Sequence, residues 1–203
     1  MTTILTVFLC FFWAGAQGQG GNDSRARFQA SAVAGLNVSQ IDGDDLNGFH
    51  QPGLNAGLRV VAVLGDRWRV GPELLFSQLG ARRNTNSINS SPYDRFRLNT
   101  VEVPLMVYYK DWRVTAQAGG SYARVIDFSV LDSGGQDVTE TRPLAEELYS
   151  IKLGAGIYLT PNLSLNVRWT RGLNNVNDFG RINMRTRTVS VRAAWTFGDG
   201  ETW

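Results

Sequence analysis

The chain has 203 residues, a formal net charge of +2 and a single cysteine. With this charge and no concentrated basic stripe, nucleic acid is not an expected partner. The cysteine, Cys10, lies in a segment that we expect to be removed, so the mature chain offers no disulfide framework and no cysteine metal site. No later stretch is apolar over the roughly 20 residues that a membrane-spanning helix needs.

Residues 1–16 have the features of an export signal. They carry no charge, are mostly apolar from Ile4 to Trp13, and end in the small residues Ala14, Gly15 and Ala16 that a signal peptidase requires. We therefore predict a signal peptide over 1–16, an N-terminal periplasmic segment over 17–27 and about 187 residues of mature chain, enough for one domain. An exported chain without a spanning helix is either soluble or a β-barrel.

Eight segments of the mature chain alternate apolar and polar residues with the period of a β-strand. The expected strands lie at about 28–38, 54–64, 68–77, 100–110, 112–118, 149–159, 163–169 and 188–197. Tight turns around Gly65-Asp66, Lys110-Asp111 and Pro161-Asn162 alternate with long polar loops at roughly 41–53, 80–97, 127–147 and 172–187. Short turns at one end and long loops at the other are typical of a bacterial outer-membrane barrel.

The sequence thus predicts an all-β fold, an eight-stranded antiparallel up-and-down transmembrane β-barrel over 28–197. Its short turns are expected in the periplasm and its long loops outside the cell, and residues 198–203 form a periplasmic tail. The alternative is a soluble lipocalin-like barrel or sandwich, which would turn its apolar face inward. The Gly, Ser, Thr and Asn content of the polar face favours the membrane barrel, and hence the outer membrane of a Gram-negative bacterium.

Aromatic residues on the apolar faces form two predicted girdles. The girdle near the periplasmic end consists of Phe28, Trp68, Tyr109, Trp112, Trp195 and Phe197. The girdle near the other end consists of Phe76, Tyr122, Tyr149 and Trp169. Two aromatic belts separated by smaller aliphatic residues match the two headgroup levels of a membrane.

Six charged residues on the polar faces fall near mid-depth of the predicted lumen. They are Arg59, Glu73, Glu102, Lys152, Arg168 and Arg192. Buried charges must pair or meet water, so we predict a lumen charge network in which the two glutamates are shared acceptors, with Arg69 and Arg113 lower down at the periplasmic mouth. Side chains can fill so narrow a lumen, which favours a largely plugged barrel. The excess of basic groups leaves a narrow anion or small-solute channel as the alternative.

Enzyme chemistry has little support in the sequence. His50, the only histidine, lies in the first long loop, and no nucleophile motif surrounds it. The segment "DGDDLNG" at 42–48 departs from a calcium-binding loop of the EF-hand type. We therefore expect no enzymatic activity, no cofactor and no metal site. The expected partners are outer-membrane lipid and lipopolysaccharide, the barrel-assembly machinery during biogenesis, and an envelope protein as a further candidate.

The segment "GPELLFSQLGARR" at 71–83 contains an irregularity, because Pro72 lies inside a predicted strand. A closed barrel has no edge strand to accommodate a proline, so we predict a bulge or a lost ladder hydrogen bond there. Pro104 on the next strand is expected to mark the same irregularity. Leu75 and Leu79 are exceptions on the polar face.

Several strand motifs resemble a known family. The motifs are "GLNVSQIDGDD", "GLNAGLRVV", "GPELLFSQLGARR", "VEVPLMVYYKDWRVTAQAGGSYARVI" and "VSVRAAWTF". They are similar to those of the small outer-membrane barrels of Bacteroidota that are labelled porin-family or PorT-like. This resemblance covers about residues 28–197 and implies an outer-membrane eight-stranded barrel without implying a substrate.

We therefore expect a structural, adhesion or accessory role. One branch of the family serves a protein secretion system, which leaves a component of a secretion or assembly complex as a further alternative. The last strand ends in Trp195-Thr196-Phe197, resembling the signal that the barrel-assembly machinery reads, although the chain continues to Trp203.

Overall fold

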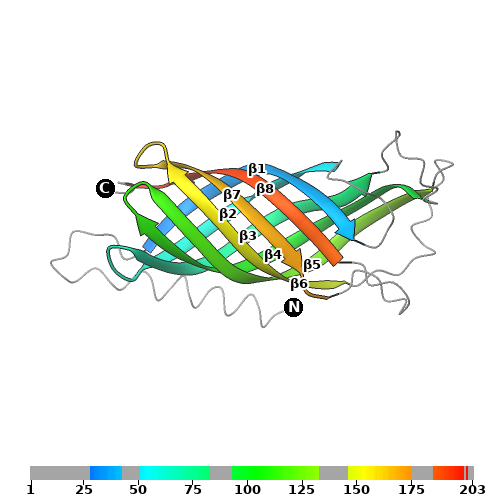
Figure 1. Ribbon diagram of the computed structural model, residues 1–203, viewed down its shortest axis with the longest axis horizontal. Helices are drawn as coiled ribbons and strands as arrows, with labels where there is room; N and C mark the ends of the chain where they lie inside the picture. The colour runs from blue at the N-terminus through cyan, green and yellow to red at the C-terminus, as the bar shows by residue number, and fades with distance from the viewer. Residues whose placement is uncertain are drawn as a thin grey trace.

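In the computed structural model, eight antiparallel strands form a closed barrel in which each strand pairs with its sequence neighbours and β8 returns to β1 (Figure 1). The structure describes residues 28–42, 51–82, 93–132, 146–174, 185–198 and 200. The strands are β1 (Phe28–Asp42), β2 (Gln51–Val63), β3 (Trp68–Arg82), β4 (Tyr93–Asp111), β5 (Val114–Asp132), β6 (Glu147–Tyr158), β7 (Leu163–Gly172) and β8 (Arg185–Thr196). The predicted fold class and the number of strands are confirmed. The described residues include no helix that is long and apolar enough to cross a membrane.

The two ends of the barrel differ in their connections. At one end, which we call the turn end, short segments join β2 to β3, β4 to β5 and β6 to β7, and β8 ends there too (Figure 1, left). The opposite end is called the loop end. The predicted signal peptide, His50, most of the "DGDDLNG" segment and the end of the predicted tail, 201–203, lie outside the described residues.

Several strands are longer than predicted at the loop end. β4 and β5 each have 19 residues, so Arg97 and Asp127, which were assigned to loops, lie in strands. Near this end charged residues such as Arg97 and Asp127 lie exposed while Leu98 points inward, so the apolar-outside, polar-inside alternation is lost although backbone pairing continues. The tight turn predicted around Lys110-Asp111 is present but lies two residues later, at Trp112 and Arg113, because Asp111 still pairs with Val114.

The two faces of the sheet have the polarity of a membrane protein. Inside the barrel, Ser31, Asn37 and Thr100 are at most 2 % exposed. On the outside, Leu58, Leu105 and many other aliphatic side chains remain exposed. A lipocalin-like barrel would have the reverse polarity, so that alternative is wrong.

Both prolines interrupt ladder pairing without changing the register. Pairing of β2 with β3 stops at Arg59–Glu73 and resumes at Ala62–Val70, leaving the Pro72 position unpaired on that side. Pairing of β3 with β4 is likewise interrupted between Pro72–Leu105 and Leu75–Glu102, opposite Pro104. The predicted loss of ladder pairing is therefore present, whereas no bulge occurs there, because each register is the same on both sides of its gap.

Small apolar clusters fill part of the lumen. The exceptional Leu75 packs against Val33 and Ala194, and Leu79 packs against a cluster that includes Leu98 and Leu148 near the loop end. The space between these clusters is occupied by polar and charged side chains, which form the candidate site.

Candidate functional site

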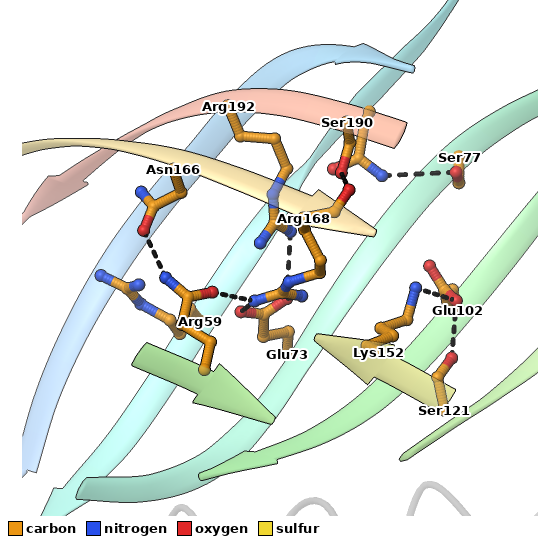
Figure 2. Close-up of polar contacts among 12 residues, drawn as sticks. Arg59, Glu73, Ser77, Glu102, Ser121, Lys152, Asn166, Arg168, Ser190 and Arg192 are labelled. Carbon is orange, nitrogen blue, oxygen red and sulfur yellow. Dashed lines mark hydrogen bonds and ion pairs between the residues drawn. The ribbon is translucent and has the colours of Figure 1, made fainter. Parts of the chain in front are cut away.

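The carboxylate of Glu73 lies at the centre of a buried group of side chains (Figure 2). Arg168 donates to both of its oxygens, from Nη1 to Oε2 at 2.7 Å and from Nη2 to Oε1 at 3.0 Å. Arg192 Nη1 donates to Oε2 at 3.2 Å, and the hydroxyl of Tyr108 donates to Oε1. We call Glu73, Tyr108, Arg168 and Arg192 the Glu73 cluster.

The Glu73 cluster crosses the lumen. In the ring of eight strands, β3 and β7 lie on opposite sides, so the bidentate pair of Glu73 and Arg168 spans the interior. Gln117 on β5 extends the group, since its Oε1 accepts from Arg168 at 2.9 Å and its Nε2 donates to Asn166 Oδ1 at 2.6 Å. Side chains of five strands, β3, β4, β5, β7 and β8, are thereby linked in one hydrogen-bonded group.

A second ion pair lies nearer the loop end. Lys152 Nζ is 2.7 Å from Glu102 Oε1, which also accepts a hydrogen bond from Ser121 at 2.6 Å (Figure 2). The ammonium group of Lys152 further donates to Thr170 Oγ1 at 3.2 Å. Sequence reasoning expected both glutamates to be shared acceptors. Among the described residues Glu73 binds two cations, but Glu102 binds one, because the Arg side chains at this level turn toward Glu73.

Arg59 is placed beside the Glu73 cluster but makes no ion pair with a described carboxylate. Glu73 is its partner in the β2–β3 register, yet no contact joins the two side chains in Figure 2. Instead, Arg59 Nη2 donates to Ser31 Oγ at 3.2 Å, and the guanidinium carbon lies 5.4 Å from the centre of the Tyr108 ring. It therefore adds positive charge to the lumen without a carboxylate of its own.

The lumen near the turn end is basic. Arg69 is 7 % exposed and Lys110 is 5 % exposed, and the Lys110 ammonium lies 5.3 Å from the centre of the Tyr158 ring. Arg113, half-buried, lies 5.7 Å from the Trp112 ring. The described acidic residues on this side of Glu73 are Asp66 and Asp111, both in or beside exposed turns. The turn half of the lumen therefore has an excess of positive charge.

The residues of the two predicted girdles lie on the outer face or in a turn. At the turn end, the rings of Trp68 and Tyr109 pack edge to face, 5.0 Å apart. At the loop end, the rings of Tyr122 and Tyr149 lie 5.6 Å apart. The remaining members, Phe28, Phe76, Trp112, Trp169, Trp195 and Phe197, are half-buried or exposed.

Sequence reasoning missed Tyr108 and Gln117 as members of the central group. The signal for Tyr108 was present, because strict alternation from Glu102 places residues 104, 106, 108 and 110 on the lumen face. Sequence reasoning instead used the neighbouring Tyr109, on the apolar face, as a girdle residue and left Tyr108 out. Gln117 was on the predicted polar face, but nothing in its spacing indicated a contact with Arg168 on the far side of β6.

A closed barrel with a polar interior, an apolar exterior and aromatic residues toward both ends is a transmembrane β-barrel. The family model described as "Outer membrane protein beta-barrel domain" matches residues 16–178, and the chain belongs to this family. The protein therefore lies in the outer membrane of a Gram-negative bacterium.

Solved structures of small outer-membrane barrels are similar to the chain. Neisserial surface protein A is 17 % identical with a TM-score of 0.53, and the match covers 84 % of this chain and 97 % of that one. The attachment invasion locus protein Ail of Yersinia pestis is 11 % identical with a TM-score of 0.49, covering 83 % and 99 %. OprG from Pseudomonas aeruginosa is 11 % identical with a TM-score of 0.40, covering 84 % and 95 %. A search of curated proteins gave no match. At this level of identity, the likeness to Neisserial surface protein A concerns the fold alone.

Proposed function

We propose that the protein is a non-conducting outer-membrane barrel, plugged by the Glu73 cluster, with a structural, adhesion or accessory role and no chemistry of its own. The observation that carries this proposal is the bidentate pair of Glu73 and Arg168, which joins opposite walls of the lumen. A solute passing along the axis would have to separate that pair.

Burial and hydrogen bonding make the pair hard to separate. The side chains of Glu73, Arg168 and Arg192 are between 0 % and 3 % exposed. Separating a buried ion pair leaves charges without partners, at a cost of roughly 3–5 kcal/mol when one partner is lost. An eight-stranded barrel also has an interior that side chains can fill, so a plugged lumen is consistent with its size.

A narrow anion-preferring channel is the second candidate, and the charge distribution favours it. Four cations, Arg59, Lys152, Arg168 and Arg192, face two carboxylates, Glu73 and Glu102, at mid-depth. Arg69 and Lys110 add positive charge on the turn side. Such a lumen would attract anions if the Glu73 cluster opened.

Conductance in planar lipid bilayers separates the two candidates. For the plugged barrel we expect no discrete openings from the wild-type protein and openings from the double variant Glu73→Ala/Arg168→Ala, which lacks the cross-lumen pair. Glu147→Ala is the matched control and should stay silent, because Glu147 is exposed near the loop end and its side chain accepts hydrogen bonds from the neighbouring Tyr122 and Tyr149. Steady anion-selective openings of the wild-type protein would instead establish the channel.

The proposal also covers the branch of the family to which the chain belongs and the lipids that surround it. The strand motifs support membership of the Bacteroidota-type, PorT-like branch, and the outward position of the aromatic girdles supports contact with outer-membrane lipid and lipopolysaccharide. The role itself would then be exerted by parts of the chain that emerge from the membrane at the loop end.

A further inference from the structure

A small cavity lies on the loop side of the Glu73 cluster. It measures about 30 Å³, and its lining includes Arg168, Arg192, Lys152 and the hydroxyl-bearing side chains of Ser77 and Ser190. A cavity of this size has room for about two water molecules. It is therefore too small for a sugar or an amino acid, but not for a single small ion with a water.

The charges around this cavity do not cancel. Three cations, Lys152, Arg168 and Arg192, contact two carboxylates, those of Glu73 and Glu102. One positive charge is left over within the group. Because the five side chains are buried, bulk water screens that charge poorly.

Two of the residues that line the cavity also carry a hydrogen-bond donor without an acceptor among the described residues. These donors are the Nε atoms of Arg168 and Arg192, two residues that are only 1 % and 3 % exposed. Their terminal nitrogens are used by Glu73 and Gln117. Buried donors are almost always satisfied in proteins, so an acceptor that is not part of the chain is expected here.

We propose that this cavity is a binding site for one small monovalent anion of the chloride class, held beside Arg168 and Arg192. Water could accept hydrogen bonds but would leave the surplus positive charge. A monovalent anion would accept hydrogen bonds and also neutralise that charge. The hydroxyl group of Ser77 supplies a further donor at the cavity wall, whereas that of Ser190 already donates to the backbone oxygen of Arg168 at 3.4 Å. The site goes beyond the plug, since it requires only a folded lumen and holds its ion whether or not the barrel conducts.

Crystals of the mature protein grown in bromide locate such a site directly. The expected result is an anomalous bromide peak inside the cavity, within hydrogen-bond distance of a guanidinium nitrogen of Arg168 or Arg192. Density without anomalous signal at that position, which identifies water, would overturn the proposal.

Chloride NMR line broadening by the detergent-solubilised protein measures binding in solution. The wild type should give saturable broadening, and Arg192→Gln should weaken binding about tenfold or more, the effect of losing one hydrogen bond to a charged group. Ser190→Val keeps every charge but places methyl groups in the cavity, so it should weaken binding too and serves if Arg192→Gln fails to fold. Arg67→Gln is the control, because Arg67 lies in an exposed turn and pairs with Asp111. Unchanged broadening in both cavity variants, or equal loss in the control, would contradict the site.

Discussion

Glu73 is the residue on which the interior depends most. Its two oxygens accept four hydrogen bonds, two from Arg168, one from Arg192 and one from Tyr108. The contrast with the exposed pair of Arg67 and Asp111 is large, since those side chains are 61 % and 70 % exposed and 3.7 Å apart. Solvent-exposed pairs contribute little to stability, whereas removing one member of a buried pair leaves the other uncompensated.

Glu73→Gln should therefore lower the free energy of unfolding by about 3–5 kcal/mol, because Arg168 and Arg192 lose their counter-charge inside the barrel. The measurement is urea unfolding in lipid vesicles, followed by tryptophan fluorescence. Glu147→Gln is the control, since Glu147 is exposed and accepts hydrogen bonds from Tyr122 and Tyr149. It should cost less than about 1 kcal/mol. Equal losses in the two variants would show that the Glu73 cluster adds no stability.

For single residues, the sequence predicts which side chains point into the lumen but not which of them form ion pairs with one another. Alternation with period 2 determines the face of each residue, so the six lumen charges follow from spacing alone. Glu73 has Arg59 as its register partner but binds Arg168 from the opposite wall. That choice depends on the diameter and stagger of the closed barrel, which no single strand encodes.

Among the elements, β1 and β8 form the seam that closes the barrel. Their pairing runs from Ser31–Thr196 to Asp42–Arg185, and within it Gly35 is opposite Arg192. A Cβ atom at Gly35 would overlap the carbonyl oxygen of Val191 and come within 2.6 Å of the Arg192 Cα. The absence of a side chain at Gly35 therefore lets β8 approach β1 closely, while the side chain of Arg192 reaches Glu73.

Gly35→Ala should force the β1–β8 seam apart and destabilise the barrel by about 1–3 kcal/mol, the usual cost of overpacking. The yield of folded protein on refolding into lipid vesicles, together with the urea midpoint, measures the effect. Gly120→Ala is a matched control within β5, because the nearest atom to its added Cβ lies 3.8 Å away. A refolding yield that falls equally in both variants would indicate a general effect of alanine and refute the close approach at the seam.

The strand centres were predictable from the sequence, whereas their ends were not. Alternation is strong only where one face meets lipid, so the outer parts of β4 and β5, with Arg97 and Asp127, were assigned to loops. The turn between β4 and β5 was placed two residues too early for a different reason. Trp112 has a positive φ of 52°, a conformation that is uncommon for a residue other than glycine, and the adjacent Asp111 looked like the better turn residue.

On the scale of the whole molecule, the polarity of the two faces explains why so much of the fold was predictable. Eight amphipathic segments with alternating short and long connections leave few arrangements other than a closed barrel. The same polarity, apolar outside and charged inside, requires lipid around the barrel and partners for the charges within it. The physiological role does not follow from these patterns, because the contact with lipid and the polar lumen determine only the residue pattern of the strands.

Heat-modifiable gel migration after fractionation of the outer membrane tests the central claim most directly, namely that this chain is a closed barrel whose apolar face meets lipid. We expect the protein in the outer-membrane fraction, migrating differently before and after boiling because the unheated barrel stays folded in detergent. Unchanged mobility together with recovery in the soluble fraction would contradict the membrane barrel, and with it the assignment of the charged face to a lumen.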